Sequence, residues 1–271
     1  MPIWLAFDCE RVRLALQSYY AASGAAPNAA GSTAWALLHT RSMRRIGDQI
    51  WVHEHSVFGI DDGLRMTILQ LDEGLWVHAP TPLTAAVREA IDALGPVRHL
   101  IAPNNHHHKS LQAWHDAYPT AQLHVSPAIP RKQPWLAHTQ YELLAATPVS
   151  AWESALQSQV IAGTPFFSET VFLHAASRSL IVTDLVQNQS ASERQTLGLR
   201  ATRALFAALG FRGVCTAPPL ALPWVRKDAA AFRASLERIL TWRFERIVVC
   251  HGAIVERDGH EIFRRLCARW L

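Results

Sequence analysis

This 271-residue chain lacks the features that mark several classes of protein. Its four cysteines form no C-x-x-C pair, which argues against a zinc ribbon and against a disulfide scaffold. Lys and Arg cluster only in pairs such as Arg44-Arg45, so the net charge of +4 indicates solubility and predicts no nucleic-acid partner. No apolar run approaches the ~18 residues of a membrane span. Asp8, Glu10 and Arg11 stand where a signal peptide needs apolar residues, so the cytoplasm is the expected location.

The N-terminal residues differ from the rest of the chain. A short helix is expected over residues 9–22, and residues 23–32 have the Gly, Ala, Pro and Ser content of a flexible linker. We interpret residues 1–42 as an N-terminal extension that is partly flexible. The alternative is that translation is assigned to a start codon upstream of the true one. Residues 43–271 are then the folded domain, which is long enough to bury a large core.

From residue 46 onward, strand-like runs alternate with helical patterns. A helix is predicted from the N-cap Thr84 to Leu94, where Gly95-Pro96 stops it. The other predicted helices cover residues 110–118, 196–209, 229–242 and 262–270. The predicted strands cover residues 50–52, 66–71, 75–78, 100–102, 123–125 and 247–250, with a hairpin formed by 170–173 and 180–183. This order predicts a layered α/β protein whose helices cover the sheet faces.

Three of the predicted strands stop on residues that can bind a metal ion. Strand 100–102 leads into Asn104, Asn105 and three histidines, strand 180–183 leads into Asp184, and strand 247–250 leads into His251. A side chain that follows a buried strand is held firmly at the rim of its sheet. Two or three histidines with one carboxylate form a catalytic zinc type of site, which leaves one position for water. We therefore expect the three strand ends to converge on one ion.

Each strand end also has an ordinary structural explanation. The three histidines could be exposed at a helix start that Asn104 or Asn105 caps. Asp184 could be a turn residue, and the imidazole of His251 could bond a backbone carbonyl. His78, on a predicted strand, is expected to be structural.

Taken together, the segments resemble the metallo-β-lactamase superfamily, and more narrowly a divergent bacterial domain-of-unknown-function branch of it. The resemblance covers roughly residues 44–271. It is carried by residues 72–80, 101–108, 118–121, Glu169, 179–184 and 248–252. Membership implies the α/β fold class and, within it, a four-layer αββα sandwich with the metal site at one edge of its two sheets.

The signature of that superfamily, H-x-H-x-D-H, is only partly present. Laid on the chain without gaps, it falls on Asn104, His106, His108 and Lys109, so one ligand matches in type and place. No carboxylate replaces the signature aspartate, and the family's next histidine would fall near Thr164, where none exists. One ion is therefore expected rather than two.

The later ligands of the family do have counterparts. Asp184 corresponds to the carboxylate that bridges two metals in the family, and His251 to its last histidine. The expected ligands are therefore His106, His108, Asp184 and His251. Asn104 and His107 are additional candidates, and Glu169 is a candidate catalytic base.

The resemblance implies a metal-dependent hydrolase of a small ester, thioester or related substrate, acting through a metal-bound hydroxide. Zinc is the expected ion, with iron or manganese as alternatives. The alternative hypothesis is a degenerate member of the superfamily, a binding or regulatory module with an incomplete or empty metal site. The expected partner is a small molecule, with no nucleic acid and no membrane.

Overall fold

Seven strands form the first sheet, and they follow one another across it in chain order. The computed structural model describes residues 43–57, 60–144, 152–190, 207–208 and 210–271. The strands are β1 (Arg44–Gly47), β2 (Ile50–Val57), β3 (Ile60–Leu71), β4 (Gly74–His78), β5 (Val97–Ala102), β6 (Gln122–Val125) and β7 (Glu142–Leu143). Strands β1 to β4 pair antiparallel, and β4 to β7 pair parallel. Helices α3 (Ala85–Leu94) and α4 (Leu111–Ala117) make the crossovers that parallel neighbours require.

The second sheet has four strands in the order β13-β10-β9-β8. These are β8 (Leu156–Val160), β9 (Thr170–His174), β10 (Ser179–Ile181) and β13 (Arg246–Val248). Strands β9 and β10 form the predicted hairpin, and β13 pairs parallel with β10. A small ladder joins β11 (Gln187–Gln189) to β12 (Gly213–Cys215), and helices α6 (Ala229–Leu240) and α7 (Gly259–Cys267) complete the C-terminal half.

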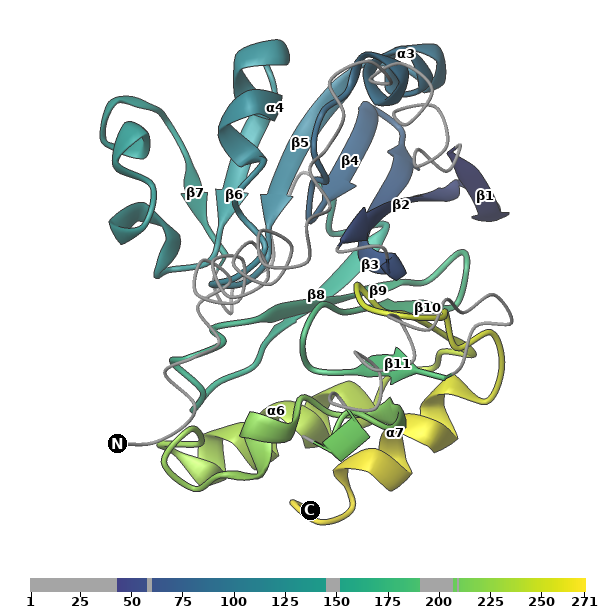
Figure 1. Cartoon of the computed structure of the whole chain (residues 1–271), viewed down its shortest axis with the longest axis vertical. Coiled ribbons are helices and arrows are strands. Elements are labelled where there is room, and N and C mark those ends of the chain that lie inside the picture. The colour runs from purple at the N-terminus through teal and green to yellow at the C-terminus, as the bar shows by residue number, and fades with distance from the viewer. Residues whose placement is uncertain (1–42, 58–59, 145–151, 191–206, 209) are drawn as a thin grey trace, which may run out of the picture. The chain divides into compact units, whose positions relative to one another are not determined.

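Three hydrophobic cores divide the domain into four layers. Leu100 of β5 packs with α3 and α4 on the outer face of the first sheet, whereas its neighbour Ile101 packs between the sheets. In the second sheet, Ile181 of β10 faces inward, and Leu180 packs outward with α6 and α7. Successive strand residues point to opposite faces, so a strand buried on both sides reads as a continuous apolar run. The arrangement is an αββα sandwich, as the resemblance implied (Figure 1).

The ends of α3 follow from its sequence. The Thr84 hydroxyl accepts a hydrogen bond from Val87 N at 3.2 Å, a cap that stabilises a helix by about 1 kcal/mol. Val87 and Ile91, one turn apart, are the buried residues of the helix. Gly95 ends it with a φ of 143°, a conformation that is unfavourable for residues with a Cβ.

Some predictions differ from the structure or fall outside it. The proline-rich middle of the chain, for which no strand was predicted, contains β8. Residues 1–42 and most of the predicted helix 196–209 lie outside the described residues. Within the described part of the chain, no helix is long and apolar enough to cross a membrane.

Candidate metal centre

The three strand ends meet at one edge of the sandwich. The segment after β5 approaches the segment after β10, where Asn104 Nδ2 donates to Asp184 Oδ2 at 2.6 Å. It also approaches the segment after β13, where His107 Nε2 lies 3.2 Å from His251 Nε2. These pairs are 80 and 144 residues apart in sequence. The edge therefore gathers chemically active side chains from both sheets.

His107, Asp184 and His251 form a close triangle of potential ligand atoms. Asp184 Oδ1 lies 3.5 Å from His107 Nε2 and 3.4 Å from His251 Nε2, and the two nitrogens are 3.2 Å apart. The side chains of His107 and Asp184 are almost fully buried, whereas that of His251 is 24% exposed. His251 is therefore the most exposed of the three side chains.

In each of the two histidine rings, the Nδ1 atom contacts a second group. His251 Nδ1 donates to the carbonyl oxygen of Gly63 at 2.7 Å, which leaves the Nε2 lone pair free. His107 Nδ1 lies 3.3 Å from Cys250 Sγ, and the thiol itself donates to the Arg65 carbonyl. The proton of the neutral His107 ring is therefore assigned to Nδ1, and its Nε2 lone pair also points into the triangle. Such outer contacts typically orient metal-binding histidines.

Asn104 shapes the turn that carries His107. Its Oδ1 accepts the backbone N–H groups of His106 and His107, each at 2.9 Å, and its Nδ2 donates to Thr183 and Asp184. The side chain thus caps this turn rather than the start of α4, and it is fully buried. One amide joins the turn after β5 to the carboxylate after β10.

Glu169 lies behind Asp184 and holds the loop that carries it. Its carboxylate accepts the N–H groups of Thr183, Asp184 and Leu185 at 2.6, 3.0 and 2.7 Å. Burial, together with the nearby Asp184 carboxylate, raises the pKa of Glu169 to about 7, although the N–H donors oppose this shift. Both oxygens are occupied, so the contacts give Glu169 a positioning role.

The charges of the cluster support one another. Burial alone would lower the pKa of His107, but Cys250 and Asp184 raise it well above its usual value. Burial would raise the pKa of Asp184, but His107 and His251 hold it well below its usual value. The pKa of the buried Cys250 thiol falls to about 7 because His107 lies beside it. The site therefore favours an ionised carboxylate among cationic or metal-bound partners.

The other two histidines of the trio lie outside the triangle. The His106 ring packs against Phe166 and Phe167 at centroid distances of 5.2 and 5.7 Å, and its Nε2 is buried without a hydrogen-bond partner. His108 Nδ1 lies 2.7 Å from Gln133 Nε2. Asp184 and His251, also expected from the sequence, do meet, and the histidine that joins them is His107. His106 and His108 as ligands remain untested predictions.

Cys250 is a neighbour that sequence reasoning passed over. Its Sγ and one ring nitrogen each of His107 and His251 lie within 4.8 Å of one another. Among the described residues this trio has metal-binding spacing, and it shares both histidines with the triangle completed by Asp184. The available signal in the sequence was the position of Cys250 directly before His251, because both residues lie at the same end of the apolar run 247–249.

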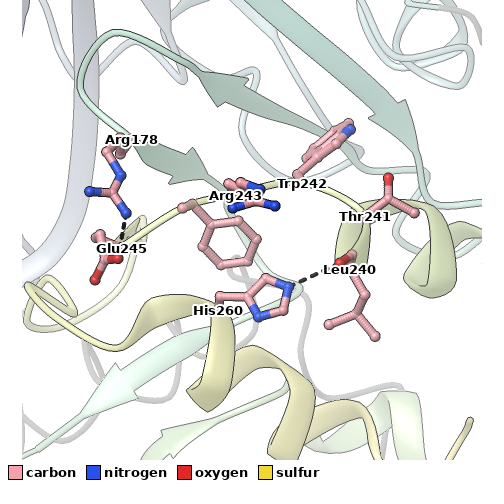
Figure 2. Close-up of a pocket in the computed structure, with 8 residues that line it drawn as sticks. Arg178, Leu240, Thr241, Trp242, Arg243, Glu245 and His260 are labelled. Atoms are coloured by element: carbon pink, nitrogen blue, oxygen red, sulfur yellow. Dashed lines mark hydrogen bonds and ion pairs between the residues drawn. The ribbon is translucent and has the colours of Figure 1, made fainter.

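One cavity of 440 Å³ lies away from this cluster. It is lined by Arg178, Leu240, Thr241, Trp242, Arg243, Phe244, Glu245 and His260. Figure 2 shows the Arg178–Glu245 ion pair and the hydrogen bond from His260 to Leu240 in its walls. Arg178 and Glu245 precede β10 and β13, whereas Asp184 and His251 follow these strands. The cavity is therefore at the opposite end of the sheet.

A family model matches residues 47–210, more than half of the chain, and is described as a domain of unknown function, DUF4336. The chain belongs to the DUF4336 family. No curated protein matches the sequence of this family member. Its fold, however, matches solved structures of the metallo-β-lactamase fold, so the chain is a divergent branch of that fold.

Three of the similar structures illustrate the relationship. The metal-soaked Flv1 flavodiiron core from Synechocystis sp. PCC6803 is 13% identical with a TM-score of 0.58, over 86% of this chain but only 60% of that protein. A metallo-β-lactamase from Hirschia baltica is 11% identical with a TM-score of 0.55, over 86% and 98% of the two chains. The mono-zinc form of FIM-1 from Pseudomonas aeruginosa is 13% identical with a TM-score of 0.53, over 85% and 96%. At these identities the likeness extends to the fold alone.

Proposed function

We propose that this DUF4336 protein binds one divalent metal ion through His107 Nε2, His251 Nε2 and Asp184 Oδ1. The observation that carries the proposal is the triangle of 3.2, 3.4 and 3.5 Å between these atoms. A tetrahedral ion with ligand bonds of about 2.0–2.1 Å separates its ligand atoms by roughly 3.3–3.4 Å. The three donors therefore fit one face of such a tetrahedron and leave the fourth position open.

The surrounding contacts favour a single ion. Asn104 stands where the superfamily signature begins, and both ends of its amide are occupied by hydrogen bonds. Thr164, near the position of the family's next histidine, is buried and donates to the carbonyl of Ile161. Neither side chain offers a ligand for a second ion beside the first.

Zinc is the ion that this donor set favours. Two imidazoles, one carboxylate and an open position form a catalytic zinc arrangement, and a nearby thiol adds affinity for a borderline-soft ion. Iron and manganese are the alternatives, since two histidines and a carboxylate also hold ferrous iron. Once the rings are deprotonated, their Nε2 atoms suit each of these ions.

We further propose that the centre hydrolyses a small ester, thioester or related substrate. A divalent ion at this site would supply Lewis acidity and lower the pKa of a water molecule towards ~7. The protein's own residues fix the orientations of the donor groups, and His251 is the partly exposed one among them. Phe166, which is 47% exposed and packs against His106, offers an apolar contact to a substrate.

A second candidate function is a binding or regulatory module with an incomplete site. It is favoured by one specific feature, the absence of a signature carboxylate between Asn104 and Lys109. In the superfamily this carboxylate helps to orient the attacking hydroxide, and none of the cluster's other contacts replaces it. Such a module would bind a metal or small molecule without turnover.

Metal content tests the first proposal. Protein purified without added metal, and the same protein loaded with zinc and desalted, should contain close to one ion per chain. The His251→Ala variant should contain far less, and the exposed His138→Ala variant should match the wild type. Less than about 0.2 equivalents in loaded wild-type protein would overturn the proposal, because a three-ligand site should retain its ion. Metal retention without turnover of thioesters, lactones or phosphodiesters would favour the binding module.

A further inference from the structure

Strand β3 holds three consecutive residues of the segment that carries His251. Gly63 O accepts from His251 Nδ1 at 2.7 Å, and Arg65 O accepts from Cys250 Sγ at 3.1 Å. The Arg65 side chain continues the series, because its Nη1 donates to Val249 O at 2.5 Å. Three hydrogen bonds from a strand of the first sheet therefore hold the segment that follows β13 of the second sheet.

Arg65 is buried, with 3% of its surface exposed. Its Nε and Nη2 donate to Glu54 Oε1 at 3.2 and 2.8 Å, and Glu54 is itself 6% exposed. A buried charge is costly unless it is paired and hydrogen-bonded, and hydrophobic residues of similar size often stabilise a fold equally well. Fold stability alone therefore gives no reason for a guanidinium here, whereas its bond to Val249 O does.

We propose that Arg65 is a positioning residue for the metal centre. Through Val249 it sets where the chain turns after β13, and so the place of His251 relative to His107 and Asp184. This inference rests on the proposed metal site and adds to it a residue that touches none of the ligand atoms. It predicts that the Arg65 guanidinium, on the first sheet, affects metal affinity through its bond to the segment that follows the second sheet.

The geometry requires arginine rather than any cation. A guanidinium is a rigid planar fork, so two of its nitrogens can face Glu54 while the third reaches Val249 O. A lysine ammonium is a single point on a flexible stem. It can pair with Glu54, but it cannot span both partners in the same fixed geometry.

Cobalt titration of the full-length chain tests the proposal. The variants are Arg65→Lys and the double variant Glu54→Gln/Arg65→Met, which removes both buried charges together; Arg44, another partner of Glu54, is half-exposed. Val87→Ala, on the buried face of α3, is the control for a general loss of stability. We expect both Arg65 variants to bind Co²⁺ about 10–100-fold more weakly and with an altered d–d absorption band, as after loss of an outer-sphere contact. The control should keep wild-type affinity and spectrum.

A second readout does not depend on metal. The labelling rate of the Cys250 thiol, followed by peptide mass spectrometry, should rise by about tenfold or more in the Arg65 variants, because a hydrogen bond from a charged donor no longer holds the segment. Folded Arg65 variants with wild-type Co²⁺ affinity, spectrum and labelling rate would overturn the proposal. Absence of Co²⁺ binding by the wild type would instead overturn the proposed function, and the labelling rates would still decide whether Arg65 holds the segment. Should Arg65→Lys not fold, the double variant decides.

Discussion

Replacing the three neighbouring histidines one at a time separates the observed geometry from the sequence alignment. The ungapped signature matches His106 and places its aspartate on His108, whereas the contacts select His107. We predict that His107→Ala abolishes tight metal binding. His106→Ala removes a ring that packs on Phe166 and should affect stability rather than affinity. His108→Ala removes only a partner of Gln133.

The magnitude follows from the number of ligands. Zinc binding to a four-ligand protein site contributes about 10–16 kcal/mol, or roughly 2.5–4 kcal/mol per ligand. Loss of His107 should therefore weaken zinc binding by about 10²–10³-fold. Loss of His106 or His108 should change it by no more than about threefold, as expected for sites outside the ligand set. Competition against a chromophoric zinc chelator measures these ratios, with circular dichroism as the control for folding. A large loss in either neighbour, with His107→Ala unaffected, would refute the triangle.

Three further results are expected. Asn104→Ala should weaken zinc binding by about 10–100-fold in the same competition assay, because Asp184 loses its amide partner; unchanged binding would contradict this role. Because the pKa of His107 is raised above 6.5, its proton must leave before the ring can bind an ion, so zinc affinity should fall as pH falls from 8 to 6. Calorimetry in buffers of different ionisation enthalpy should detect the released proton, and a pH-independent affinity would argue against the shift. Gly252→Ala should destabilise the fold by about 2 kcal/mol or more, which a lower Tm would show. The φ of Gly252 is +84°, and a Cβ there would lie 1.7 Å from Asn188 O. An unchanged Tm would count against that close approach.

Much of the fold could be predicted from local pattern. The helix capped by Thr84 and the hairpin of β9 and β10 are confirmed, because each depends on neighbouring residues and on burial. Strand β8 was not predicted, because Gln157 and Gln159 leave it with little apolar content of its own. It is extended because it pairs with β9. Tertiary pairing decides such segments.

The sequence indicated which strand ends come together, whereas metal binding at them stays a prediction. Asp184 and His251 follow directly from buried strands, so their convergence is a consequence of the parallel pairing of β10 and β13. Which histidine of the trio faces them depends on contacts distant in sequence. Asn104 binds Thr183 and Asp184, and Asn105 donates to the carbonyls of residues 165 and 166. These hydrogen bonds fix the orientation of the turn. The spacing of residues in the signature does not predict them, because their partners are distant in sequence.

The same amide explains how a broken signature can still make a coherent site. In the superfamily pattern the first signature position supplies a histidine ligand; here Asn104 orients Asp184 instead, and its Oδ1 shapes the turn that presents His107. Asn104 therefore contacts Asp184 directly, while His107, three residues further along the turn, faces the same carboxylate. Asn104 holds Asp184 Oδ2, whereas Oδ1 faces the two imidazoles, so the carboxylate presents one oxygen to the proposed ion.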